Sequence, residues 1–113
     1  MALEVRFHPA ARAQLFELHD HIATEAGLAR AGGYLDRLEA SCMTLGQFPE
    51  IGRRADALGP GLRLHPFERR AMIVYRIVPE AVEILGIYHG GRDLEALRVR
   101  NAETWGEGEL PEA

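Results

Sequence analysis

The stretch Ala71–His89, AMIVYRIVPEAVEILGIYH, decides the fold of this chain. It contains two apolar runs of strand length, 71–78 and 82–89, separated by a Pro-Glu link short enough for a hairpin turn. In the first run both alternating sets of residues are apolar except at Arg76. A strand with two apolar faces is typical of a sheet interior, so residues 71–78 are predicted to form a central strand.

Upstream of this hairpin, two further strands are predicted. Leu62–His65 is a third strand-like run, and residues 52–61 before it, rich in Gly, Pro and Arg, are typical of a loop. Near the other end of the chain, Leu3–Phe7 alternates apolar with charged residues. That two-residue period indicates a half-buried strand.

Two helices are predicted between the N-terminal strand and the loop. Pro9 suits a first helical position, and the apolar residues that follow have helical spacing to about residue 26. Gly27 suits the position just after a helix end. A second set at helical spacing comes next, although Gly32-Gly33 should weaken its first turns: Ala31, Leu35, Leu38, Cys42 and Leu45. Only a short link around Gly27 joins the two predicted helices, so they are expected to form an antiparallel hairpin.

The order strand, two helices, three strands predicts an α+β fold, in which the helical hairpin covers one antiparallel-rich sheet. A chain of 113 residues is one domain, expected here over residues 1–100. Residues 92–100 are compatible with a short helix. Residues 101–113 carry four glutamates, two glycines and a proline, and are expected to be a flexible acidic tail.

Composition excludes several classes of protein. The chain is 47% hydrophobic and 27% charged, which is close to the globular average. It lacks any apolar run of the roughly 18 residues that a membrane-spanning helix needs. Its first residues do not form a basic segment followed by an apolar one, so we expect a cytoplasmic protein. Cys42 is the only cysteine, which excludes an internal disulfide and a thiolate-rich metal site.

The charges are unevenly distributed. All 13 basic residues are arginine, and the formal net charge of −4 comes from the four acids of the tail, because residues 1–100 carry equal numbers of both signs. Six arginines lie between positions 53 and 76, against only Asp56 and Glu68. Folding this segment as a hairpin would concentrate positive charge on a small surface.

Five ordered fragments carry a resemblance to a known family. They are FHPAARAQL at 7–15, FPEIGR at 48–53, GLR at 61–63, VYRI at 74–77 and IYHGGRD at 87–93. Together with the helical hairpin between the first two, this set resembles the ParE branch of the RelE/ParE toxin superfamily, also known as the plasmid stabilisation family. The resemblance spans roughly residues 3–98.

The resemblance implies a cytoplasmic toxin of a type II toxin–antitoxin module, held in a hetero-oligomer by a cognate ParD-like antitoxin that wraps over it. ParE-like members are known as DNA gyrase inhibitors, whereas RelE-like members cleave mRNA in the ribosome. It implies no cofactor and no metal, and His8, His19 and His21 do not have metal-ligand spacing.

The chemistry of RNA cleavage favours the ParE branch. Such cleavage needs a group that takes the 2′-hydroxyl proton, an acid for the leaving oxygen and a cation for the phosphorane charge. RelE-like nucleases place an arginine just ahead of the Val-Tyr pair, where this sequence has Met72. We therefore expect no catalytic residues. Were the chain a nuclease, the candidates would be His89, Arg63, Arg70 and Arg92. A degenerate member that only binds its antitoxin is a third reading.

Two groups of residues are candidates for other roles. Arginine forks suit carboxylates and phosphates, and apolar side chains can anchor a docked helix, so these are candidate partner-binding residues: Arg63, Arg69, Arg70, Tyr34 and Phe48. The alternative role of the three arginines is a solvated, charged sheet edge, and that of Tyr34 is a core or rim aromatic. The structural motif is expected to comprise Tyr75, Arg76, His89, Arg92 and Asp93. Arg76 needs a carboxylate partner in a central strand, and Glu83 on the next strand is the candidate.

Overall fold

A computed structural model describes residues 2–68 and 71–89 of the chain. The expectations for Arg69 and Arg70, for Arg92 and Asp93, and for a short helix and acidic tail after residue 90 lie outside the described residues.

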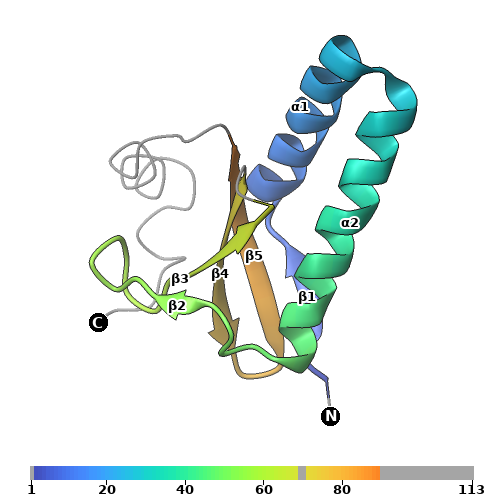
Figure 1. The fold of residues 1–113 in the computed structure, drawn as a ribbon. Coiled ribbons are helices and arrows are strands. Elements are labelled where there is room, and N and C mark those ends of the chain that lie inside the picture. Colours follow the sequence, from blue (N-terminus) through green and yellow to red (C-terminus); the bar gives the residue numbers. More distant parts are fainter. Residues whose placement is uncertain (1, 69–70, 90–113) are drawn as a thin grey trace.

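One five-stranded sheet and two helices make up the described fold (Figure 1). The strands have the order β1-β5-β4-β3-β2, with β1 parallel to β5 and all other neighbours antiparallel. This confirms the predicted α+β class and the central position of β4. The elements are β1 (Glu4–Phe7), α1 (Pro9–Ala26), α2 (Leu28–Gln47), β2 (Arg53–Arg54), β3 (Arg63–Phe67), β4 (Ala71–Val78) and β5 (Ala81–His89).

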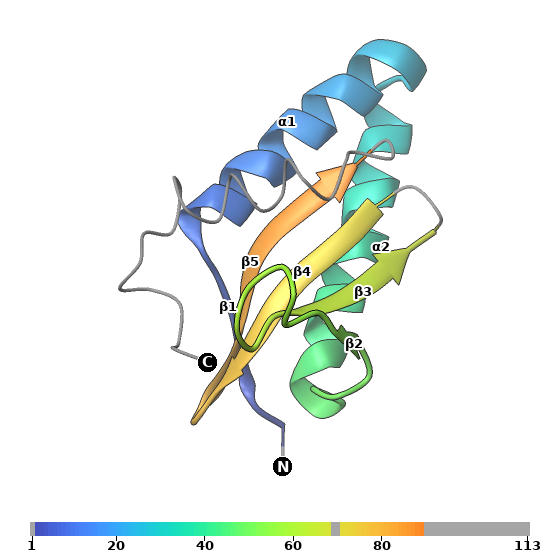
Figure 2. The same ribbon diagram turned by 90° about the vertical axis from the view of Figure 1, so that its left-hand side faces the viewer.

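Both helices pack on one face of the sheet, and the loop between β2 and β3 lies on the other side (Figures 1 and 2). Helix α1 begins at Pro9, where the preceding His8 accepts a hydrogen bond from the Ala10 N–H through its Nδ1, at 3.1 Å. It ends at Ala26 and is followed by Gly27, whose φ of 97° favours glycine. The second helix starts directly afterwards, earlier than its apolar pattern suggested, because tertiary packing tolerates Gly32-Gly33 inside it.

Two details of the sheet differ from the prediction. The two-residue strand β2 lies in the expected loop, where Arg53 pairs with Leu64. So short a strand leaves no periodic signal in a sequence. In addition, β3 continues to Phe67 through Pro66. Proline is tolerated there because β2 pairs only with Arg63 and Leu64, so the rest of β3 is an edge.

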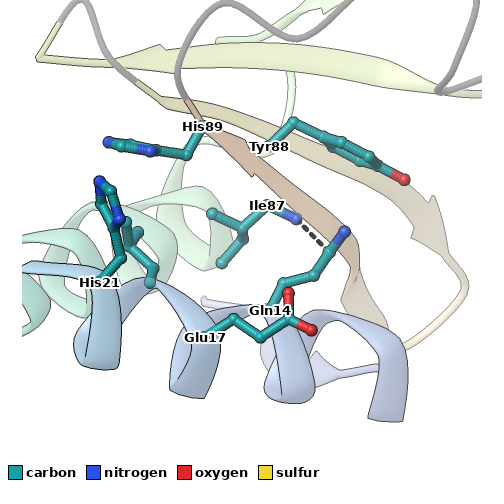
Figure 3. A pocket seen from close by; sticks show the side chains of 7 residues that line it. Gln14, Glu17, His21, Ile87, Tyr88 and His89 are labelled. Carbon is teal, nitrogen blue, oxygen red and sulfur yellow. Dashed lines mark hydrogen bonds between the residues drawn. The ribbon is translucent and has the colours of Figure 1, made fainter.

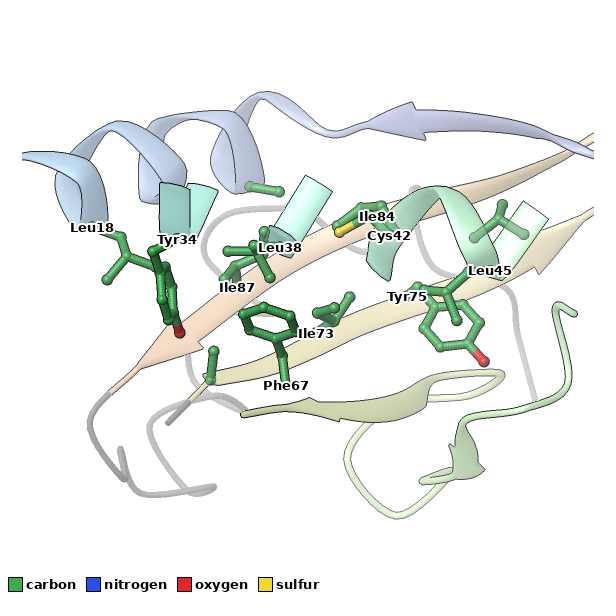
Figure 4. Close-up of a cluster of buried hydrophobic side chains, with 13 residues drawn as sticks. Leu18, Tyr34, Leu38, Cys42, Leu45, Phe67, Ile73, Tyr75, Ile84 and Ile87 are labelled. Atoms are coloured by element: carbon green, nitrogen blue, oxygen red, sulfur yellow. The ribbon is translucent and has the colours of Figure 1, made fainter. Parts of the chain in front are cut away.

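The sheet is buried on both faces. A cluster called here the helix-side cluster fills the space between helices and sheet (Figure 4). Its buried members are Ala11, Leu18, Tyr34, Leu38, Cys42, Leu45, Phe67, Ala71, Ile73, Tyr75, Val82, Ile84 and Ile87. Cys42 is fully buried, as predicted. The opposite cluster consists of Leu62, Leu64, Val74, Leu85 and Tyr88, with Met72 packed against them.

The last strand needs a partner beyond the end of β1, because β1 pairs only with residues 81–84 of β5. The chain turning into α1 supplies it. The His8 N–H donates to the Ile84 carbonyl at 2.8 Å, and the Gln14 Oε1 accepts from the Ile87 N–H, also at 2.8 Å. These two bonds, from His8 and from Gln14 of α1, extend the hydrogen bonding of β5 beyond β1, toward the strand end that carries His89.

Candidate partner-binding site

Two hollows meet where the helical hairpin passes the end of β5. The larger, called here the hairpin groove, has a volume of about 580 Å³ and lies between α1, α2, Glu68 and His89. The smaller, about 200 Å³, lies between α1 and β5 and is lined by Gln14, Glu17 and Tyr88 among others (Figure 3). His21 and His89 line both hollows.

His21 and His89 face each other edge to face, with ring centroids 5.7 Å apart and planes at 63° (Figure 3). They come from α1 and from the end of β5, so the contact joins the helical hairpin to the sheet. Within residues 2–68 and 71–89, no group of three His, Cys, Asp or Glu side chains is arranged to hold a metal ion.

An arginine–carboxylate pair, Arg37 with Glu68, also lines the hairpin groove. Arg37 of α2 donates from Nε and Nη2 to the two carboxylate oxygens of Glu68, at 2.8 and 3.1 Å. The hydrogen bond raises the pKa of Arg37 and lowers that of Glu68. Arg37 also lies over the ring of Tyr34, 5.6 Å from its centroid. The pair links α2 to the end of β3.

Tyr34, a predicted partner-binding residue, lies in the helix-side cluster. Its side chain is only 8% exposed, and its ring packs edge to face on Phe67 with centroids 5.3 Å apart. The large exposed apolar side chains of the described residues lie elsewhere: Phe16, Leu28, Met43, Phe48, Ile51 and Ile77. Among these, Phe48 and Ile51 flank Pro49 and Glu50 in a single loop and are 58% and 54% exposed.

Arg63 and Tyr75 form hydrogen bonds with the backbone of that loop, residues 48–52. The Tyr75 hydroxyl donates to the Pro49 carbonyl at 2.7 Å and accepts from the Gly52 N–H at 2.9 Å. Arg63 Nη1 donates to the carbonyls of Gly52 and Glu50, at 2.7 and 3.3 Å. The guanidinium of Arg63 is thus engaged with backbone of its own chain.

The described members of the candidate nuclease set lie apart. His89 pairs with Ala71 across the sheet, whereas Arg63 pairs with Tyr75. Ala71 and Tyr75 are four residue steps apart along β4, which corresponds to roughly 13 Å. Met72, at the position of the RelE-like arginine, packs in the opposite cluster.

Arg76 pairs with Glu83, as predicted. Arg76 Nε donates to Glu83 Oε1 at 2.7 Å, and the side chains are 12% and 28% exposed. The two residues are direct neighbours across β4 and β5. Arg76 is therefore satisfied within the sheet.

The sequence did not single out Arg37 and Glu68. Arg37 follows Tyr34 by three positions on a helix, a spacing that brings side chains together, and this was the available signal. Its pairing with Glu68 depends on the packing of α2 against β3, which local spacing does not encode.

Comparisons with known proteins agree with this architecture. A solved structure described as the chromosomal ParDE toxin–antitoxin system from P. aeruginosa superposes with a TM-score of 0.70 at 21% identity, covering 78% of this chain and 96% of that one. The toxin–antitoxin complex RelBE2 from Mycobacterium tuberculosis gives 0.57 at 20% identity, covering 81% and 95%. Among functionally curated proteins, none matches the sequence significantly.

The fold is therefore the one shared by ParE-like and RelE-like toxins. Residues 5–94 match the sequence family described as the ParE toxin of the type II toxin–antitoxin system parDE. Since that match covers most of the chain, the protein belongs to the ParE toxin family. Within the part of the chain that the structure describes, no helix is long and apolar enough to cross a membrane.

Proposed function

We propose that the protein is a toxin that acts in the cytoplasm by binding and inhibiting DNA gyrase, and that a cognate antitoxin neutralises it in a hetero-oligomer. Membership of the ParE family is the observation that carries this proposal. The two solved structures of similar fold are toxin–antitoxin assemblies, which supports an antitoxin partner. A role in plasmid stabilisation would follow if the module is carried on a plasmid.

The arrangement of the described side chains supports a binding toxin over a nuclease. Cleavage needs a cation near the reacting phosphate. Arg63 already donates to two backbone carbonyls, and Met72 provides no charge. His89 packs against His21. Measured along the strands, His89 lies roughly 13 Å from Arg63.

A supercoiling assay tests the gyrase proposal. Purified toxin should inhibit supercoiling by gyrase, or trap gyrase–DNA cleavage complexes, in proportion to the toxin added. Prior incubation with the antitoxin encoded by the adjacent reading frame is the control, and it should restore gyrase activity. Cleavage of mRNA on translating ribosomes with gyrase unaffected would instead establish the endoribonuclease alternative. Expression without growth arrest would identify a member that only binds its antitoxin.

The antitoxin is proposed to lie across the helical hairpin and to reach the sheet near Arg63–Arg70. Apolar anchors give such docking its affinity, and charges at the rim steer association. Phe16, Leu28 and Phe48 are exposed and available as anchors. Tyr34 is buried in the helix-side cluster and would contact the antitoxin only where it lines the hairpin groove.

Replacing Arg69 and Arg70 with glutamate tests the rim charges. Association of the double variant with the antitoxin should be slower than that of the unaltered toxin, and the difference should shrink at high salt. Glu107→Gln with Glu109→Gln in the acidic tail is the matched control and should have little effect. Equal binding by the unaltered toxin and the arginine variant at both salt concentrations would remove these arginines from the interface.

A further inference from the structure

The Arg37–Glu68 pair has the geometry of a carboxylate held in a receptor. Two nearly parallel N–H···O bonds join the guanidinium to both carboxylate oxygens. This bidentate fork is the arrangement by which arginine recognises carboxylates in partners. Both residues line the hairpin groove, so the pair faces the hollow in which a partner could lie.

The arginine half of the pair is preorganised. Arg37 lies over the Tyr34 ring, and that ring is held by its contact with Phe67 in the core. The helix α2 that carries it is packed on the sheet through its fully buried Leu38. The guanidinium would therefore keep its position if its present carboxylate left.

The glutamate half is held weakly. The side chains of Arg37 and Glu68 are 57% and 41% exposed, and exposed ion pairs contribute little to stability. Displacing the Glu68 side chain from Arg37 should therefore cost little free energy.

We propose that Arg37 is the receptor for a carboxylate of the antitoxin, and that Glu68 is a built-in competitor which that carboxylate displaces. This inference rests on the proposed function. A single acidic side chain on an amphipathic segment fits the groove, because its lining combines the apolar Ile22, Ala26 and Ala29 with the cations Arg30 and Arg37. A nucleic acid fits poorly, because its repeated phosphates would meet these two arginines together with Glu25 and Glu68, whereas one carboxylate needs only the fork of Arg37.

Glu68→Gln tests the competitor. Glutamine has nearly the same shape but no charge, so it should release Arg37 without changing the turn. The Kd for the antitoxin of the adjacent reading frame should fall by about twofold to fivefold at low salt, the range expected for one exposed ion pair. Glu4→Gln is the matched control, since it breaks the exposed Arg6–Glu4 pair on β1, outside the groove, and should leave the Kd unchanged.

Arg37→Gln tests the receptor. Losing a bidentate, charge-assisted contact should raise the Kd about tenfold. Because Glu68 is proposed to act only through Arg37, the double variant Arg37→Gln, Glu68→Gln should bind like Arg37→Gln alone. Arg37→Lys keeps the charge but loses the fork, and it replaces the glutamine variant if thermal unfolding shows that the latter does not fold.

The results separate this inference from the proposed function. An unaltered toxin that does not bind the antitoxin would contradict the proposed function, and the inference with it. Binding by the unaltered toxin with no gain in Glu68→Gln, or independent and additive effects of the two substitutions, would overturn the competitor model alone.

Discussion

Tyr75 shows how a single hydroxyl can position a loop at the surface. Its ring is buried in the helix-side cluster, while its oxygen bonds to the backbone of Pro49 and Gly52. Glycine is required at position 52, since a Cβ there would lie 2.6 Å from the Tyr75 oxygen. The loop is thereby fixed with Phe48 and Ile51 turned outward.

Tyr75→Phe should lower the free energy of unfolding by about 1–3 kcal/mol, because the buried Gly52 N–H loses its acceptor while the ring keeps its packing. Urea denaturation measures the change. A loss below about 0.5 kcal/mol, the level of an ordinary surface substitution, would contradict this account of the loop.

Cys42 should not react in the folded protein. Burial raises the pKa of its thiol to about 12, with a smaller contribution from Glu39. A thiol reagent at pH 8 should therefore label it only after unfolding. In the unfolded chain the thiol ionises at its usual pKa near 9, so the contribution to stability is complete below pH 9 and is lost between pH 9 and 12. Rapid labelling under native conditions would show that the thiol is accessible.

At the scale of elements, the contacts between chain ends and helices set the positions of the strands. Helix α2 approaches the N-terminal strand so closely that the Leu3 N–H donates to the Gly46 carbonyl at 2.8 Å. A Cβ on Gly46 would lie 2.5 Å from the Leu3 oxygen. Gly32, in the same helix, has open space around its Cβ position.

Gly46→Ala and Gly32→Ala should therefore change stability in opposite directions. The first should cost about 1–3 kcal/mol through the forced shift of Leu3. The second should add about 0.4–1 kcal/mol by restricting the unfolded chain and favouring helix. Thermal unfolding of the two variants side by side is the measurement. Two equal shifts in Tm would refute the close approach of α2 and β1.

Gln14→Met should loosen the end of β5, because the Ile87 N–H loses its acceptor at 2.8 Å. We expect a loss of about 1–2 kcal/mol and faster hydrogen exchange at the Ile87 amide. Gln14→Glu retains an acceptor oxygen and is the matched control. Unchanged exchange at Ile87 in the methionine variant would show that this cap does not protect the strand.

The sequence predicted those elements whose pattern is local. The β4–β5 hairpin was identified because two apolar runs of full strand length flank a short Pro-Glu link, and the observed register confirms the predicted Arg76–Glu83 pair. Strand β2 was missed because two residues carry no period. The roles of Arg63 and Arg37 were not predictable, since both depend on backbone or carboxylates brought near by tertiary packing.

At the scale of the whole molecule, the central sheet joins two buried clusters into one unit. Leu38 lies fully buried on the helix side, and Leu64 lies 1% exposed in the opposite cluster. The strands between them contribute to both clusters, since Ile73 faces one and Val74 the other. Neither face of the sheet should therefore unfold alone.

Leu38→Ala and Leu64→Ala should each cost about 2–5 kcal/mol, the range for large-to-small substitutions in a core. Both variants should still unfold in a single transition, monitored by fluorescence and by far-UV circular dichroism. Separate transitions by the two probes in either variant would show that the clusters unfold independently.

The parallel pairing of β1 with β5 has a consequence for synthesis of the protein. Glu4–Phe7 are made long before their partners Ala81–Ile84, which are among the last residues of the described fold to be made. Such distant pairing carries a large loop-closure cost and slows folding. The sheet therefore cannot close until Ala81–Ile84 have been made, so the nascent chain lacks the β1–β5 pairing during most of the synthesis of the described fold.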